Sequence, residues 1–531
     1  MSCLAPFTCL LQSTKRVGQG RISGKSQKQS PHTSPIHILD DDSLLNIFYL
    51  YRPGIFDGDE GDEVRITGGR GWDRERWWYK LAHICQRWRN LILRSPSYLG
   101  LCLVCTYGTP VADMLAHSPP LPLVIDYDND GDDGDCKITA EDEEGIILAL
   151  GKRDRVHRVR LQISVLKMKK VIMAIDEEYP ALEYLAMAPW PEDRSMALML
   201  PETLQAPHLR HLLLVDFVLP RGSRLLTNAV GLVTLVLYVA HPATYFQPNT
   251  LLQWISFMPQ LETLVISILY PVPGRHVEGQ SMQTPITTNV TLPNLRWFQF
   301  QGVRDYMEEV VRRITTGTPR LEKLEIEFFK QLTFSIPCLV QFMNAAENLR
   351  FNSAKFKFFK DKVQVYIEAY PPKEAEKYAL SIFVDCWHLR QLSSVAQIFN
   401  SLSRTLSTVE HLAFEHMEHN RSSEEHNEVD RTEWHKLLKS FSNVKTLRVD
   451  DGLVKALSCG LRLEDGEHPP ELLPELQELR YSGSGNTADA FTSFIDARQN
   501  AGRPVSMRKP TFFEVVDMMT GNGAARGDLD A

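Results

Sequence analysis

The chain has 531 residues, a length that allows for about three or four domain-sized units. Its 43% hydrophobic and 23% charged residues are ordinary for a globular chain and exclude wholesale disorder or a fibrous repeat. The 58 basic and 66 acidic residues give a net charge of −8, so the chain lacks the excess of Lys and Arg that binding to a nucleic-acid backbone favours.

The nine cysteines are scattered along the chain, which favours free thiols in a reducing compartment, either the cytoplasm or the nucleus. The longest apolar stretch, residues 232–240, falls far short of the ~18 residues that a membrane-spanning helix needs. We therefore expect neither a membrane nor a nucleic acid among the partners of this chain.

Residues 1–34 are basic and rich in Ser, Thr and Gln, and they contain no carboxylate. This composition is typical of a disordered basic tail, and an organellar presequence is the alternative interpretation. Residues 507–531 are interpreted as a C-terminal tail.

The first organised segment lies at residues 38–51. The aspartates at 40–42 supply an N-cap and first-turn carboxylates, which stabilise the positive end of a helix. The apolar residues that follow fall on one helical face: Leu44, Leu45, Phe48 and Tyr51. This spacing predicts a short amphipathic helix.

A second helical pattern covers residues 73–93. Its apolar residues form a broad stripe: Trp77, Leu81, Ile84, Cys85, Trp88, Leu91 and Ile92. Residues 53–71, between the two patterns, are rich in Gly and in acidic side chains, which predicts a solvated inserted loop. Residues 35–100 are therefore interpreted as one helical module.

These two patterns resemble an F-box, specifically the F-box-like domain common in mushroom-forming fungi. The resemblance is carried by LDDDSLLNIF at 39–48 and WWYKLAHICQRWR at 77–89. Further stretches resemble the same family in the same order: SPSYLGL at 95–101, Thr109-Pro110, LPLVI at 121–125, RDRVHRVRL at 153–161 and ARQNAGRPV at 497–505. The chain departs from the family pattern at Asp40, where the family has Pro, and at Ser43, where it has an aliphatic residue.

The resemblance implies a substrate-recognition adaptor of a cullin-type ubiquitin ligase. In that family the F-box helices dock on a Skp-type subunit of the ligase, and the rest of the chain holds a protein client. Carried onto this sequence, the docking residues are Ile38, Leu39, Leu44, Leu45 and Phe48, supported by Trp88. The alternative is a binding scaffold with no ubiquitin link, in which the helical module caps the following domain.

Residues 101–150 are predicted to form a linking α/β segment. Cys102 and Cys105 lack a second pair at zinc-binding spacing, so residues 101–105 are interpreted as a strand with two incidental thiols. An acidic loop at 126–135 begins like a calcium site, but Lys137 stands where a bidentate Glu is needed. We expect no metal site here.

A leucine-spaced pattern recurs through residues 151–506: an apolar residue is followed by further apolar residues three and five positions later. Ten copies begin at Val156, Leu182, Leu209, Leu232, Leu261, Leu295, Leu321, Val409, Val444 and Leu476. In six copies a proline stands two residues before the first apolar position, whereas 31 prolines in the chain would place fewer than one there by chance. Because Pro cannot continue a helix, each copy predicts the start of a strand.

Most copies are about 23–35 residues apart, which fits an irregular leucine-rich-repeat solenoid with a curved parallel sheet. The longer interval between Leu321 and Val409 is expected to hold one or two degraded repeats, around Leu349 and residues 378–387. A doubly wound α/β enzyme is the alternative, but it needs a glycine-rich turn after a strand, and no repeat supplies one. We therefore expect an α/β fold without a catalytic site or a cofactor.

Strand alternation sends the residues between the leucine-spaced positions to the opposite face of the sheet. In the early repeats these residues are apolar: Leu213, Val215, Val236, Tyr238 and Val265. In the later repeats they are polar or charged: Gln299, Gln301, Glu325, Glu327, Glu415, Arg448, Asp450, Glu478 and Arg480. We expect the apolar set to bind a client or to lie under a covering element. The later, largely acidic set suits a basic or mixed-charge client, or solvent alone.

Overall fold

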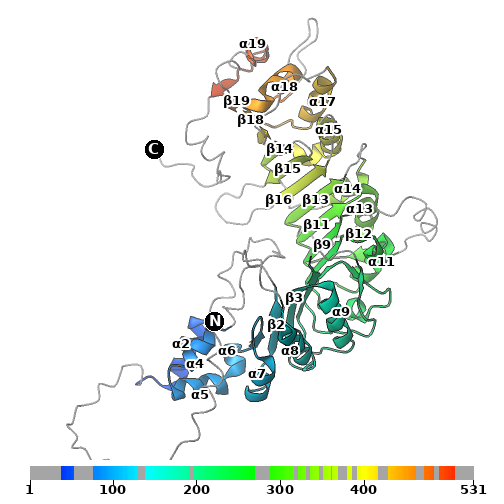
Figure 1. Cartoon of the computed structure of the whole chain (residues 1–531). Helices are drawn as coiled ribbons and strands as arrows, with labels where there is room; N and C mark the ends of the chain where they lie inside the picture. Colours follow the sequence, from blue (N-terminus) through cyan, green and yellow to red (C-terminus); the bar gives the residue numbers. More distant parts are fainter. Residues whose placement is uncertain are drawn as a thin grey trace, which may run out of the picture. The chain divides into compact units, whose positions relative to one another are not determined.

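The computed structural model describes residues 38–52, 76–128, 138–190, 196–269, 288–315, 321–329, 335–345, 351–359, 362–368, 379–385, 391–416, 428–461, 472–482 and 490–508. The predicted N-terminal tail and the insert at 53–71 lie outside these residues, as do the acidic loop beyond residue 128 and the C-terminal tail beyond residue 508. The chain divides into two compact units, residues 1–229 and 230–531. The fold is mixed α/β, with mostly parallel strands (Figure 1).

The first unit opens with short helices, which are α2 (Asp41–Tyr51), α4 (Trp77–Ala82), α5 (Gln86–Arg94) and α6 (Pro96–Leu99). Helix α2 begins where the sequence predicts, because the Asp40 carboxylate accepts a hydrogen bond of 2.7 Å from the backbone N–H of Ser43. The same contact lowers the pKa of Asp40.

The prediction of one helix over 73–93 is wrong: helices α4 and α5 are separated by residues 83–85. Cys85 is extended and caps α5, its Sγ accepting a hydrogen bond of 3.4 Å from the backbone N–H of Trp88. The break leaves Ile84 outside any helical stripe, with 59% of its surface exposed. Sulfur is a weak acceptor, so this cap is hard to recognise in a sequence.

The sheet of the first unit is parallel and follows chain order. Its strands are β1 (Leu103–Cys105), β2 (Leu123–Tyr127), β3 (Val156–Ile163), β4 (Tyr184–Pro189) and β6 (His211–Val215). Its helices are α7 (Val111–His117), α8 (Ala140–Leu150), α9 (Val165–Ala174) and α10 (Arg224–Thr227), and β5 (Leu198–Met199) pairs separately with β7 (Phe217–Val218). Because β2 pairs directly with β3, the segment predicted as a linker at 101–150 belongs to the same sheet as the first repeats.

The second unit continues the alternation of strands and helices. Its strands, in spatial order, are β8 (Thr234–Val239), β9 (Thr263–Ile268), β11 (Trp297–Gly302), β13 (Lys323–Phe329), β16 (Ala379–Asp385), β15 (Lys362–Glu368), β14 (Ser353–Phe358), β17 (His411–His416), β18 (Thr446–Asp450), β19 (Glu478–Ser482) and β20 (Ser506–Arg508). A small pair, β10 (Val290–Thr291) and β12 (Ile314–Thr315), lies apart from this sheet.

The helices of this unit cover one face of its sheet, which we call the inner face; the opposite face is the outer face (Figure 1). They are the 3-10 turn η4 (Pro242–Thr244), α11 (Pro248–Ile255), α13 (Arg304–Val311), α14 (Pro337–Ala345), α15 (Gln391–Ser401), α16 (Ser403–Leu406), α17 (Glu428–Leu438), α18 (Asp451–Leu461) and α19 (Thr492–Asn500). The same two names are used for the leucine-bearing and opposite faces of the sheet in the first unit.

The strand starts predicted from the leucine-spaced pattern are confirmed. In nine copies the strand begins two residues after the first apolar position, as β9 does after Leu261, and in the tenth β3 begins at Val156 itself. The second and third positions of each copy fill the inner face: Leu264 and Ile266 of β9 are both fully buried. This inner face is the core on which each strand stacks against its neighbours.

The prediction of a wholly parallel sheet is wrong in the long interval between Leu321 and Val409. Strand β15 runs antiparallel to both of its neighbours, β14 and β16, and β16 rather than β14 pairs with β13. Strands β14 and β15 are separated by only residues 359–361, and so short a connection can join only antiparallel strands. The interval therefore contains three strands, out of chain order. Two of them, β14 and β16, lie where the degraded repeats were expected and pair in parallel with β17 and β13, whereas the antiparallel β15 was not predicted.

Arg498 anchors the last repeat. Its guanidinium donates hydrogen bonds to the backbone carbonyls of Leu473 (3.0 Å), Pro474 (3.1 Å) and Leu476 (3.1 Å), just before β19 begins. Burial among these groups lowers the pKa of Arg498. Leu473 sits at a positive φ of 50°, so the arginine holds a tight turn that the sequence alone does not reveal.

Candidate partner-binding surfaces

The predicted docking residues of α2 divide between the interior and the surface. Leu44 and Phe48 are buried, at 0% and 1% exposure, and the Phe48 ring packs edge-on against Trp88 with centroids 4.8 Å apart. Their assignment to a partner-facing surface is corrected, because side chains that form the core of the helical module cannot also contact a partner in this conformation. Trp88 is buried and supports the module from within.

The remaining docking candidates stay accessible. Ile38 is 77% exposed, and Leu39 and Leu45 are half-buried. Arg87 fixes the start of the helix by donating to the backbone carbonyl of Leu39 and to the carboxylate of Asp41, the latter at 2.8 Å.

Helix α2 also presents exposed apolar side chains, among them Tyr51, which was predicted on the same face as Leu44 and Phe48. Ile47, Leu50 and Tyr51 are 43%, 81% and 57% exposed, and their i, i+3, i+4 spacing places them on one side of the helix. Tyr51 lies beside Trp77, with ring centroids 6.4 Å apart. The spacing was visible in the sequence, but only the burial of Phe48 shows which stripe faces solvent.

The helical module is tied to the sheet of its own unit by two polar side chains. The Trp78 indole N–H donates to the carbonyl of Cys102 at 3.3 Å, and Arg76 donates to the carbonyl of Val104 at 3.2 Å. Burial at this junction raises the pKa of Tyr79 to about 12. The module is therefore fixed on β1 rather than carried on a free linker.

The apolar outer-face residues predicted to bind a client are largely buried. In the first unit Leu213 and Val215 are 7% and 6% exposed, and in the second unit Val236 and Val265 are 1% and 2% exposed. Tyr238 is half-buried. Apolar side chains on an uncovered sheet face would be exposed to water. Their burial means that the chain itself covers them, which was one of the two expectations. Their assignment as a client surface is therefore corrected.

A small hollow of about 20 Å³ remains on the outer face of the first unit, bordered by Asp128, Arg160, Tyr184, Ala186 and Leu213. Arg160 forms an ion pair with Asp128, so the charge in the hollow is internally compensated.

Beside this hollow, Arg158 lies over the ring of Tyr184, 5.1 Å from its centroid, and the Tyr184 and His211 rings are 6.0 Å apart. Burial and the charges of Arg210 and Arg158 lower the pKa of His211. This favours a neutral imidazole.

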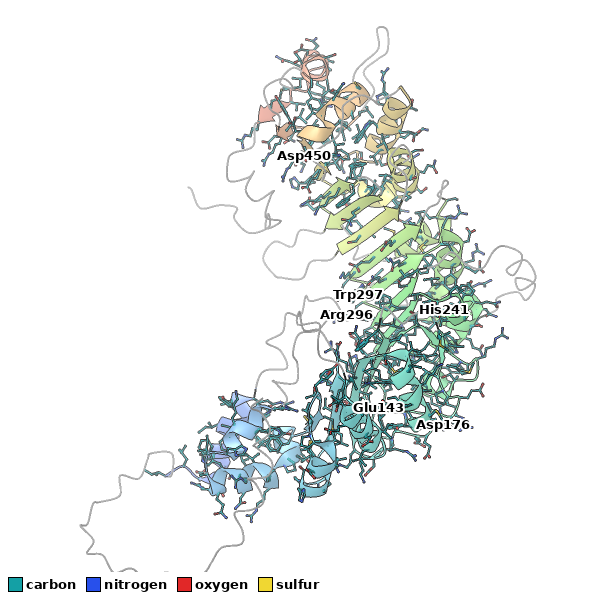
Figure 2. All side chains as sticks on the ribbon, viewed as in Figure 1. Glu143, Asp176, His241, Arg296, Trp297 and Asp450 are labelled. Atoms are coloured by element: carbon teal, nitrogen blue, oxygen red, sulfur yellow. The ribbon has the colours of Figure 1, made fainter. Side chains whose placement is uncertain are left out.

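The outer face of β11 and β13 combines an aromatic ring with charges. The Lys323 ammonium lies 4.2 Å from the centroid of the Trp297 ring and 3.1 Å from the carboxylate of Glu325 (Figure 2 labels Trp297). Gln299, Gln301 and Glu327 are half-buried on the same face. The predicted acidic character of this region is therefore reduced by a lysine that the outward pattern had not included.

The carboxylates of the later strands are also engaged within the chain. Glu415 of β17 lies 3.5 Å from the Lys355 ammonium of β14. Asp450, labelled in Figure 2 at the end of β18, accepts backbone N–H bonds from His416 at 3.1 Å and Asp451 at 2.9 Å. The prediction of an acidic surface for a basic client is weakened, because these acidic groups already have partners.

The last three strands carry arginines on the outer face. Arg480 lies 3.1 Å and Arg508 3.4 Å from the carboxylate of Glu478, so one glutamate pairs with two guanidinium groups. Arg448 stands on the next strand in register with Arg480. Arg508 was missed because the predicted repeat domain ended at residue 506, whereas β20 extends to residue 508.

Within the described residues, no three His, Cys, Asp or Glu side chains are grouped so that they could hold a metal ion. No helix in the described part of the chain is long and apolar enough to cross a membrane. Comparison with protein-family models and with curated protein sequences found no match for this chain.

Proposed function

We propose that this chain is a substrate-recognition adaptor of a cullin-type ubiquitin ligase, acting in the cytoplasm or nucleus. Its residues 35–100 act as an F-box-like module that docks a Skp-type subunit, and its repeats form a leucine-rich-repeat solenoid that binds a protein client. The proposal is supported by the F-box-like motifs, by the capped helix α2 and by the leucine-spaced strand starts.

The observation that carries the docking part of the proposal is the exposed apolar stripe of α2. Leu50 keeps 81% of its surface exposed and lies beside Ile47 and Tyr51, whereas the same helix buries Leu44 and Phe48. Contiguous exposed apolar side chains of this kind mark interaction surfaces. The proposed docking surface is therefore Ile47, Leu50 and Tyr51, together with the accessible Ile38.

In this role the chain contributes position rather than chemistry. Holding a client on the repeats while the helical module holds the ligase raises the effective concentration of client lysines near the ubiquitin donor. The adaptor itself forms no covalent bond with the client, so the proposal requires no catalytic residue.

Co-purification of the full chain with a purified Skp-type subunit tests the proposal. The double variant Ile47→Asp with Leu50→Asp is expected to lose the subunit, because two carboxylates would have to be desolvated in an apolar contact. Met173→Asp on α9 is the matched control, since Met173 is also 81% exposed, and it should retain the subunit. Failure of the unaltered chain to bind the subunit, or equal binding by all three proteins, would contradict the docking surface.

A binding scaffold without a ubiquitin link is the second candidate. It is favoured by the junction between the helical module and β1, where Trp78 and Arg76 donate to sheet carbonyls as a capping element would. Under this alternative the folded, unaltered chain recovers no ligase subunit, and the double variant in α2 leaves client capture unchanged.

A further inference from the structure

A row of cations crosses the outer face at the end of the second unit. Strand register pairs Lys355 of β14 with Ala413 of β17, and Ala413 with Arg448 of β18. It then pairs Arg448 with Arg480 of β19, and Arg480 with Arg508 of β20. Five consecutive strands therefore present four cations and one alanine in a single line, which we call the cationic row.

Among the described residues, the ion pairs of the cationic row involve fewer carboxylates than cations. Lys355 lies near Glu415, and Arg480 and Arg508 share Glu478, whose side chain is only 16% exposed. Among the described residues, no carboxylate pairs with Arg448. Within the part of the chain that the structure describes, the ion pairs of the row thus join two carboxylates to three of its four cations.

Asp450 lies on the same face of β18, two residues from Arg448, and contributes one negative charge beside the row. Its two oxygens accept backbone N–H bonds from His416 and Asp451. Like charges directly opposite each other on neighbouring strands destabilise a sheet. An added anion along the row would relieve that repulsion while forming charge-assisted, bidentate bonds with the guanidinium groups.

We propose that the cationic row binds an acidic peptide segment of a client, laid across strands β14 and β17–β20. The four strand spacings span about 19 Å, which an extended peptide of about six residues matches. The cations form a single line, with Glu415, Asp450 and Glu478 beside it, and this arrangement suits one extended acidic peptide. A long polyanion is disfavoured, because the protein itself carries a net charge of −8 and would repel it. The inference rests on the proposed client-binding role of the repeats and specifies the chemistry of the client.

Fluorescence anisotropy with a fluorescein-labelled hexaglutamate peptide tests the inference on the full chain. The unaltered chain is expected to bind this peptide. The affinity should fall at least tenfold in Arg448→Glu. It should also fall at least tenfold when the NaCl concentration is raised from 50 to 500 mM, because salt screens the attraction between the charges. Arg404→Glu on α16 is the matched control, because it makes the same charge change at an exposed arginine outside the row, and it should bind normally. A hexalysine peptide should not bind.

Three results would overturn the inference: no binding of hexaglutamate, equal weakening by Arg448→Glu and Arg404→Glu, or tighter binding of hexalysine. If Arg448→Glu fails to fold, Arg448→Gln is measured instead and should weaken binding at least threefold; unchanged binding contradicts the row. Capture of the Skp-type subunit is measured on the same proteins. If the chain binds the Skp-type subunit but not the peptide, only this inference is contradicted. If it binds the peptide but not the Skp-type subunit, only the adaptor role is contradicted.

Discussion

The outer face of the sheet changes character between the first and the last strands of the second unit. On β8 and β9 it carries Val236 and Val265, which the chain buries almost completely. On β18 and β19 it carries Arg448 and Arg480, which remain partly exposed. The inner face is apolar and buried at both ends, so the leucine-spaced positions specify the fold and leave the outer positions free to differ.

The same leucine-spaced strand pattern therefore occurs with two kinds of outer face, one apolar and one charged. Where the outer residues are apolar, the sheet is buried on both faces, as parallel sheets usually are. Where they are charged, one face stays in contact with water and can receive a partner. A client surface is therefore better sought among β17–β20 than among β8 and β9.

The largest expected effect comes from placing a carboxylate at equivalent positions on the two ends of the sheet. Val265→Asp should lower the free energy of unfolding by about 3–5 kcal/mol, because an unpaired charge would replace a buried valine. Ala413→Asp should change it by less than about 1 kcal/mol, since the new carboxylate lies between Lys355 and Arg448 in strand register.

Urea denaturation of both variants measures the difference. Equal losses of stability would show that the outer faces of β9 and β17 are alike, and the proposed division of the sheet would be wrong. In the peptide assay, Ala413→Asp should also weaken hexaglutamate binding, because it supplies the cationic row with a carboxylate of its own.

The inner face could be predicted from the sequence far better than the surfaces. Leucine spacing with a preceding proline locates strand starts, because both signals are local: Pro207 ends one segment and Leu209 precedes β6. The apolar character of Val265 was also evident, but whether the chain or a client covers it depends on contacts between distant segments. Apolar residues at outer positions indicate that this face is buried, but they do not indicate which segment or protein buries it.

The features that escaped prediction depend on weak or long-range interactions. The break at residues 83–85 uses a thiol cap at Cys85, and the antiparallel β15 lacks the leucine-spaced pattern that marks ten of the other strands. The cationic row was missed for a different reason. Arg448 and Arg480 belong to the predicted outward set, but only strand register adds Lys355 and Arg508 to the same line.

A second expected effect distinguishes an arginine that supports the fold from one that faces a partner. Arg498→Ala should lower the free energy of unfolding by about 2–3 kcal/mol, because buried carbonyls before β19 would lose charge-assisted hydrogen bonds. Arg503→Ala, at an exposed position in the same stretch, should change it by no more than about 0.5 kcal/mol. Thermal or urea unfolding provides the comparison, and similar losses in both variants would contradict the anchoring role of Arg498.

The smallest expected effect concerns the stability of the cationic row itself. Arg448→Met keeps the aliphatic stem on the sheet and removes one of the row's four positive charges, so at low salt it should raise the free energy of unfolding by about 0.5 kcal/mol. Glu478→Gln removes the carboxylate shared by Arg480 and Arg508 and should lower it by about 1 kcal/mol. Both differences should fade in 1 M NaCl, where the screening length is only about 3 Å. If Arg448→Met is instead destabilising at every salt concentration, Arg448 is a structural residue, and repulsion along the row cannot be part of the reason that an acidic peptide binds there.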